Sequence, residues 1–544
     1  MTIEFTSLAL IYISFIAFAA KRMMTYMHVL QQEDYDNARL QKWIFENKTY
    51  DKRLTFFLIV LGVIALTQML PAFFMNFLIF ICFTIIMYLE KDPRKNAKKK
   101  LIPTTRAKRT FFPALLLSMV SGIWCFWGGH PFIWIICVQI IPFVLILANA
   151  LIKPFEEIIQ LSYWQDANAK MQHLQPTVIG ITGSFGKTSV KHILGHILKS
   201  YAPTLITPGS VNTPMGITRI IRERLDESHK YFIVEMGAYG KGSIKRLCDL
   251  TPPNFGVITA IGHAHYERFR SLDTVAQTKF ELAEAVLDKE GDVIIHERTL
   301  RFQSSRQLKL DNPKRFTVCG EPPEIDPHKQ VGANYLSKED FHINKVDQTD
   351  SGLKVALSWE GKNHTYTIPL FGLHHGHNAS LAIATALKLG LEEEDIRKTL
   401  TSLPQIEHRL EVIKHPDGST VIDDAYNSNP MGFRSALDLL AVLKTGGKRI
   451  LITPGIVELG SAHDEAHATL GEYAGEVCDV AVVVLPKRIP SFIEGFKKTG
   501  GSKTLIQVET FDEASEWLAN NRQSGDLILL ENDLPDMYER VPKM

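Results

Sequence analysis

Long apolar stretches dominate the first 150 residues of the chain. A helix needs about 20 apolar residues to cross the ~30 Å hydrocarbon core of a bilayer. Five stretches of 17–21 residues come close to that length, namely 3–20, 54–70, 72–89, 111–127 and 131–151. The pattern therefore predicts a transmembrane domain of five helices over residues 1–152, followed by a linker helix over 153–175.

Positive charge predicts how these helices are oriented. Residues 1–152 carry 16 basic and 8 acidic residues, whereas the rest of the chain carries 44 and 51. The basic residues concentrate in the connections 21–53 and 90–110, and the two short connections have none. Because cytoplasmic loops retain positive charge, we expect a multi-pass protein of the bacterial inner membrane. Its N-terminus should lie outside, and everything after Lys153 should be cytosolic.

Beyond residue 175 the chain alternates short apolar strands with amphipathic helices. This alternation is typical of an α/β fold with a mainly parallel sheet. We expect one such domain over 176–403 and a smaller α/β domain over 404–544. Strand-like pieces within 293–370 predict a small antiparallel extension. The second domain should have strands near 420–424, 449–453, 480–485 and 527–530.

Composition excludes several other classes of protein. The net charge of +1 gives no reason to expect a nucleic-acid partner. The six cysteines contain no Cys-x-x-Cys pair, so the sequence predicts neither a disulfide framework nor a zinc site. Reduced thiols fit a cytosolic main body.

The most informative segment is a glycine-rich turn between a strand and a helix. Residues 177–190 read TVIGITGSFGKTSV. Glycines allow backbone N–H groups to converge on phosphate oxygens at the start of a helix. Lys187 is expected to offset phosphate charge, and the Thr188 hydroxyl to bind Mg²⁺. The segment therefore predicts a nucleotide site that includes Gly183, Ser184, Gly186, Lys187, Thr188 and Ser189.

Seven further motifs follow this turn in order. They are TPGSVNTPMGIT (207–218), VEMGAYGKGSI (234–244), AIGHAHYERFRSLDTVAQTKFEL (260–282), FGLHHGHNASLAIATAL (371–387), HRLEVI (408–413), IDDAYNSNP (422–430) and TPGIVELG (453–460). With these motifs the sequence resembles the Mur ligases, ATP-dependent enzymes that form peptide bonds in cell-wall synthesis. It is most similar to the members that add D-alanyl-D-alanine to a UDP-muramoyl-tripeptide. The resemblance implies ATP and Mg²⁺, an acyl-phosphate intermediate, and catalysis between a central ATP-binding domain and a C-terminal domain.

The resemblance also implies roles for individual residues. The expected catalytic residues are Lys187, His265 and Lys279, the last as a carbamate formed with CO₂. The expected metal ligands are Thr188, Glu235, His265 and that carbamate. Asn378, Arg409 and Asp424 should contact the nucleotide, and Asn212, Thr213, Tyr426 and Asn427 the substrates. Without the resemblance, Lys279 would be interpreted as a surface lysine on a charged helix face.

Three departures from the family pattern bear on the substrate. His375 stands where relatives usually carry an asparagine near adenine, and TPGIVELG replaces a Gly-Asp-Met-type loop. The five-helix region occupies the place of a small UDP-binding domain. We expect a cell-wall precursor or other carboxylate, an amino acid or dipeptide amine, and membrane lipid as partners. Two alternatives stay open: a synthetase of a polyamide such as poly-γ-glutamate, and an ATP-driven transporter or sensor.

Overall fold

The chain folds as two compact units in a computed structural model. The first comprises Met1–Leu161 and the second Ser162–Asp533. The structure describes residues 2–96, 100–128, 131–262, 269, 271–321, 336–337, 339–426, 429–444, 446–457 and 459–532.

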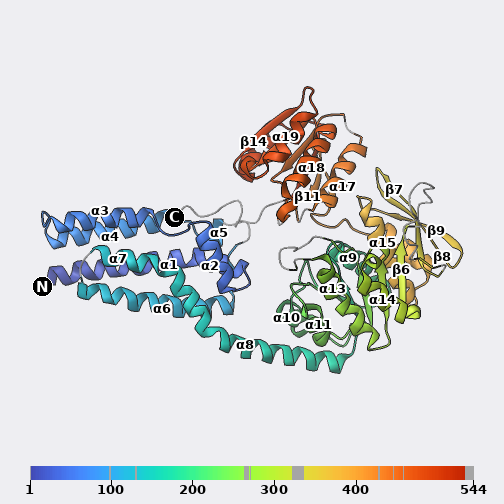
Figure 1. The fold of residues 1–544 in the computed structure, drawn as a ribbon, viewed down its shortest axis with the longest axis horizontal. Helices are drawn as coiled ribbons and strands as arrows, with labels where there is room; N and C mark the ends of the chain where they lie inside the picture. Colours follow the sequence, from blue (N-terminus) through green and yellow to red (C-terminus); the bar gives the residue numbers. More distant parts are fainter. Residues whose placement is uncertain are drawn as a thin grey trace. The chain divides into compact units, whose positions relative to one another are not determined.

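The first unit is helical (Figure 1). An aromatic cluster of Phe15, Phe83 and Trp134 lies in its core, with ring centroids 5.2–5.7 Å apart. Its helices are α1 (Thr2–Gln32), α2 (Asn37–Glu46), α3 (Arg53–Leu66), α4 (Ala72–Leu89), α5 (Pro93–Asn96), α6 (Thr105–Gly128), α7 (Pro131–Gln139) and the first part of α8 (Ile141–Leu174).

The prediction of five membrane-spanning helices is confirmed only in part by the lengths and compositions of the described helices. Among the described residues, two helices are long and apolar enough to cross a bilayer, Phe5–Gln32 and Ala72–Lys95. A third candidate arises if α7 and α8, which meet at 46°, form one bent span. The helix α3 has only 14 residues, or about 21 Å of length. The helix α6 begins with basic residues. The apolar part of its described sequence is therefore shorter than the helix itself.

The second unit contains two sheets, of which the larger has nine strands in the order β2-β3-β1-β4-β5-β6-β7-β8-β9. Its strands are parallel from β2 through β7, and β7, β8 and β9 are antiparallel. The strands are β1 (Thr177–Thr182), β2 (Thr204–Ile206), β3 (Tyr231–Glu235), β4 (Phe255–Ile258), β5 (Asp292–His296), β6 (Phe316–Gly320), β7 (Phe341–Thr349), β8 (Gly352–Trp359) and β9 (Lys362–Ile368). The antiparallel extension thus begins at Phe341 and not near 293, because β5 and β6 continue the parallel sheet.

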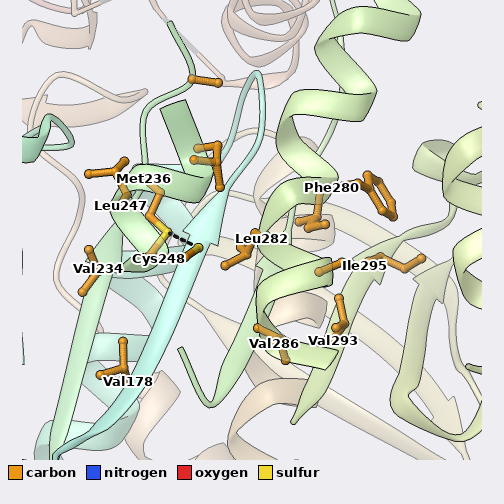
Figure 2. Close-up of a cluster of buried hydrophobic side chains, with 14 of the residues drawn as sticks. Val178, Val234, Met236, Leu247, Cys248, Phe280, Leu282, Val286, Val293 and Ile295 are labelled. Carbon is orange, nitrogen blue, oxygen red and sulfur yellow. Dashed lines mark hydrogen bonds between the residues drawn. The ribbon is translucent and has the colours of Figure 1, made fainter. Parts of the chain in front are cut away.

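Two hydrophobic cores cover the two faces of this sheet. Val178 and Ile179 are neighbours on β1 but belong to different cores, as expected when successive side chains of a strand point to opposite faces. One face packs against α10 (Pro214–Arg224), α11 (Ser243–Leu250) and α13 (Leu272–Leu287), and Figure 2 shows Phe280, Leu282 and Val286 in this core. The other face packs against α9 (Lys187–Tyr201), α15 (His374–Lys388) and α16 (Glu393–Thr401).

The smaller sheet has six strands in the order β10-β11-β15-β12-β13-β14. All are parallel except β10, which pairs antiparallel with β11. The strands are β10 (Glu411–Lys414), β11 (Thr420–Asp424), β12 (Arg449–Thr453), β13 (Val480–Val484), β14 (Thr504–Val508) and β15 (Leu527–Glu531). The four strands expected from the sequence are present, and β10 and β14 were missed because their outer-edge positions leave them only partly apolar. The helices α17 (Pro430–Val442), α18 (His463–Val477), α19 (Pro490–Lys498) and α20 (Phe511–Asn521) accompany this sheet.

The last three turns of α8 belong to the second unit. Ala167 and Met171 are 0% and 5% exposed in its core. Asn168 Nδ2 donates to the carbonyl oxygen of Asp249 at 3.0 Å, and Lys170 Nζ donates to that of Arg222 at 3.1 Å.

These contacts predict where the second unit can be cut from the first. A chain beginning at Ser162 should fold alone, whereas one beginning at Gln175 should lose about 2–5 kcal/mol of unfolding free energy, because it exposes the core beneath Met171. Urea unfolding of the two truncated proteins measures the difference. Equal stability would contradict a structural role for residues 162–174.

Candidate active site

The glycine-rich turn joins β1 to α9 and is held by hydrogen bonds to the segment after β4. The N–H of Ser184 donates to the carbonyl oxygen of Ala260 at 2.7 Å, and Ser184 Oγ pairs with backbone atoms of Gly262 at 3.0 Å. Gly186 precedes α9 at φ +83°, a left-handed conformation that favours glycine. A Cβ at this position would also overlap Asn378 Oδ1. The glycine therefore allows the tight turn into α9 and the close approach of Asn378.

Two lysines lie one turn apart on α9, and the first of them contacts the glycine-rich turn. Lys187 Nζ donates to the carbonyl oxygens of Gly183 and Ser184, at 2.7 and 3.2 Å. Loss of hydration lowers the pKa of its ammonium, and the carboxylate of Glu235 opposes this effect. Lys191, one turn later, is 3% exposed and lies 2.7 Å from Glu235 Oε2.

Glu235 ends β3 beside this turn and is 1% exposed. Its Oε2 accepts from Thr188 Oγ1 at 3.0 Å as well as from Lys191, and its Oε1 accepts from Asn212 Nδ2 at 3.2 Å. Burial acts to raise the pKa of this carboxyl, but Lys191 and Lys187 outweigh burial, and the pKa is lowered. The site thus holds an ionised carboxylate next to a hydroxyl. Such hard oxygen donors suit Mg²⁺.

Lys279 projects from α13 toward the same turn and is not on the surface. It is 5% exposed, and its Nζ donates to the carbonyl oxygen of Gly183 at 2.8 Å. Burial, and then the nearby charge of Lys187, hold its pKa well below the usual value for lysine. Both effects shift Lys279 toward the neutral amine, compared with an exposed lysine. Lys279 and Lys187 line one cavity with Gly183, Ser184, Asn212, Gly237, Ala238, Tyr239 and Phe269.

The start of α15 lies against the same turn. Asn378 is 7% exposed, beside Gly186. His375 is 1% exposed, and neither of its ring nitrogens has a hydrogen-bond partner among the described residues. His374 Nδ1 lies 3.2 Å from Ser435 Oγ. Burial lowers the pKa of His374 to about 4, so this imidazole is neutral at physiological pH.

The remaining predicted residues come from the segment around β10 and β11. The guanidinium of Arg409 lies 4.7 Å from the ring centroid of Tyr426, whose hydroxyl donates to Ser210 Oγ. Asp424 is 9% exposed and accepts from the N–H of Leu410 at 3.2 Å. Burial raises the pKa of Asp424 to about 7, and Arg409 opposes this shift.

The structure brings most of the predicted residues to one end of the larger sheet. Thr213 caps α10 by accepting from the N–H of Gly216 at 3.4 Å, and Ser189 is buried within α9. Their proposed contacts with ligands stay predictions. His265 and Asn427 lie outside the described residues.

Sequence reasoning missed two side chains that contact the proposed metal ligands or their partners. Lys191 follows Lys187 by one helical turn in GKTSVK, and that i, i+4 spacing was the available signal. Tyr239 donates to Asn212 Oδ1 at 2.8 Å. No local pattern marked Tyr239, because its contact depends on a segment 27 residues away.

Two protein-family descriptions match the second unit. Residues 181–386 match the Mur ligase middle domain, and residues 408–531 match the Mur ligase, glutamate ligase domain. The chain belongs to the Mur ligase family. This membership confirms the resemblance and the α/β fold, and it makes the protein an ATP-dependent, ADP-forming amide ligase that uses Mg²⁺. It also argues against a transporter or sensor as the main activity.

Individual Mur ligases extend this comparison. The UDP-N-acetylmuramoyl-tripeptide–D-alanyl-D-alanine ligase of Bacillus subtilis (strain 168) is 28% identical over 382 residues, which span 70% of this chain and 78% of the relative. A crystal structure of MurF from Acinetobacter baumannii superposes with a TM-score of 0.57 at 26% identity, covering 70% of this chain and 78% of that one. The MurF ligase of Thermotoga maritima in complex with ADP shares the fold, with a TM-score of 0.56 at 23% identity over 69% of this chain and 80% of that one.

Proposed function

We propose that this Mur ligase is membrane-anchored and joins D-alanyl-D-alanine, or a similar amine, to the carboxylate of a muramoyl peptide. The observation that carries the proposal is the group of Lys187, Glu235 and buried Lys279 around one phosphate-binding turn. We infer the substrates from the names of the relatives.

Each residue of this group has a task in such a reaction. ATP supplies the phosphoryl group that activates the carboxylate, and the amine then displaces phosphate. Lys187 offsets the negative charge that gathers where two anions meet. Thr188 and Glu235 would hold Mg²⁺, and Lys191 keeps Glu235 ionised and in place. Lys279, as a carbamate, would add an anionic metal ligand, and Arg409 would bind phosphate oxygens.

Apolar side chains exposed on the first unit support the membrane anchor. A soluble monomer seldom exposes large contiguous apolar patches. On the helices of this unit, the exposed apolar residues include Phe56, Phe57 and Val63 of α3, Phe73, Phe74 and Phe77 of α4, Phe112, Leu116 and Trp124 of α6, and Phe143, Leu147 and Leu151 of α8. Lipid chains are the partner that such a surface fits.

The substrates are tested by ATP-dependent phosphate release from the full-length enzyme in detergent. UDP-muramoyl-tripeptide with D-alanyl-D-alanine should release phosphate and yield a pentapeptide product detectable by mass spectrometry. L- or D-glutamate as the amine should give little release. Turnover with glutamate and none with the dipeptide would contradict the proposed amine and favour a polyamide synthetase.

The anchor is tested by cysteine labelling in intact cells. A cysteine at position 2 should react with a membrane-impermeant reagent, and one at position 95 should not. The helices α1 and α4 run side by side in the same direction, with Asn76 bonded to Ser7 and Glu90 paired with Arg22, so position 95 lies at the opposite end of the unit from position 2. This arrangement requires the chain to return across the bilayer through α3, and it leaves the basic connection 90–104 in the cytosol. Labelling at position 95 only after cell lysis confirms that the residue is accessible. The reverse pattern would contradict the orientation.

A further inference from the structure

The two oxygens of Glu235 are held by different parts of the chain. Oε2 accepts hydrogen bonds from Thr188 and Lys191, both on α9. Oε1 accepts a hydrogen bond from Asn212, which lies in the loop between β2 and α10. The orientation of the carboxylate therefore depends on Asn212 as well as on the phosphate-binding helix.

The amide of Asn212 has only one orientation that suits its neighbours. An ionised carboxylate only accepts hydrogen bonds, so the amide must turn Nδ2 toward Glu235. Its Oδ1 then faces Tyr239, whose hydroxyl donates to it at 2.8 Å. Tyr239, Asn212 and Glu235 thus form a directional chain of hydrogen bonds.

The packing around this chain leaves little room for another arrangement. A Cβ at Gly237 would lie 2.8 Å from both Asn212 Oδ1 and Tyr239 Cε2. The N–H of Gly237 also donates to the carbonyl oxygen of Asn212 at 3.0 Å. The bare glycine backbone therefore lets the amide and the phenol meet.

We propose that Tyr239 is a positioning residue for the metal site, acting through Asn212 on Glu235. The role rests on the proposed function, because it requires a metal ion at Thr188 and Glu235. Without the phenolic hydroxyl, Asn212 Oδ1 loses its donor and the amide can rotate. Glu235 Oε1 then loses an oriented partner, and the carboxylate is less often directed to the metal.

The test is a Mn²⁺ titration of the full-length enzyme with a non-hydrolysable ATP analogue, in which electron paramagnetic resonance reports free Mn²⁺. Tyr239→Phe should raise the dissociation constant of Mn²⁺ about three- to ten-fold, the range of one neutral hydrogen bond. In turnover assays its Mg²⁺ requirement should rise similarly, with kcat restored at high Mg²⁺. Tyr201→Phe is the control, because Tyr201 is 55% exposed at the end of α9.

A double-mutant cycle with Asn212→Ala separates this role from a merely structural one. If Tyr239 acts through Asn212, the double variant should bind Mn²⁺ no more weakly than Asn212→Ala alone. Wild-type affinity in Tyr239→Phe, or additive effects of the two substitutions, would overturn the proposal. The titration contains neither carboxylate substrate nor amine, so an error in the proposed substrates cannot cause its failure. A wild-type enzyme that bound no Mn²⁺ with the analogue would overturn both the metal site and the role of Tyr239.

Discussion

Lys187→Ala is expected to lower ATP-dependent ligation by about 10²–10³-fold, the usual cost of losing one charge contact to a transition state. Lys187 is the first residue of α9 and lines a cavity with Gly183 and Ser184, where phosphate oxygens would bind, and the charge of Glu235 acts on its ammonium. No other described lysine on α9 is placed to replace it, because Lys191 already binds Glu235 and the carbonyl oxygen of Gly209. Initial rates of phosphate release at saturating ATP measure the loss.

The matched control for this variant is Lys199→Ala. Lys199 is an exposed lysine in the last turn of the same helix, so its removal should leave the rate unchanged. Lys187→Ala should still insert into membranes and unfold at a similar temperature. Near-normal turnover in Lys187→Ala would show that the glycine-rich turn does not take part in catalysis.

Lys279→Ala is expected to be almost inactive, with a loss on the order of 10²-fold, and to be partly rescued by a short carboxylic acid such as acetate. A neutral amine reacts with CO₂, forming an N–C bond and releasing a proton. Burial and the charge of Lys187 favour the neutral form of Lys279. The alanine variant leaves space at the wall of the cavity where a small carboxylate can bind.

The pH dependence of this carbamate has a definite sign. As pH falls through the lowered pKa of Lys279, the amine is protonated and the carbamate is lost. Wild-type activity should therefore need more CO₂ at lower pH, and it should fall in CO₂-depleted buffer. Lys289→Ala, at an exposed position after α13, should show neither effect. Full activity in Lys279→Arg, whose guanidinium forms no stable carbamate, would contradict the hypothesis.

Sequence patterns predict secondary structure well where it depends on interactions between residues that are close along the chain. The strand, glycine turn and helix over 177–201 were predicted because backbone geometry and side-chain spacing express them directly. The ordered motifs identified the family. Those up to residue 387 lie beside strands and helices of the larger sheet, and the last three (408–413, 422–430 and 453–460) lie at strands of the smaller sheet. Counting apolar stretches predicted the number of membrane-spanning helices less accurately, because α3 ends after 14 residues and α6 begins with basic side chains.

The sequence by itself determined the α/β class, the phosphate-binding turn and the family. Only the tertiary structure decided which charged groups are desolvated and which of them meet. Lys279 looks like a surface residue along its own helix, yet α13 packs against the sheet through Phe280, Leu282 and Val286 (Figure 2). The amine of Lys279 is thereby left buried at the turn. Tyr239 and Asn212 likewise meet only because the segments after β2 and β3 converge at one end of parallel strands. A pKa or a hydrogen bond depends on distance in space, which spacing along the chain does not express.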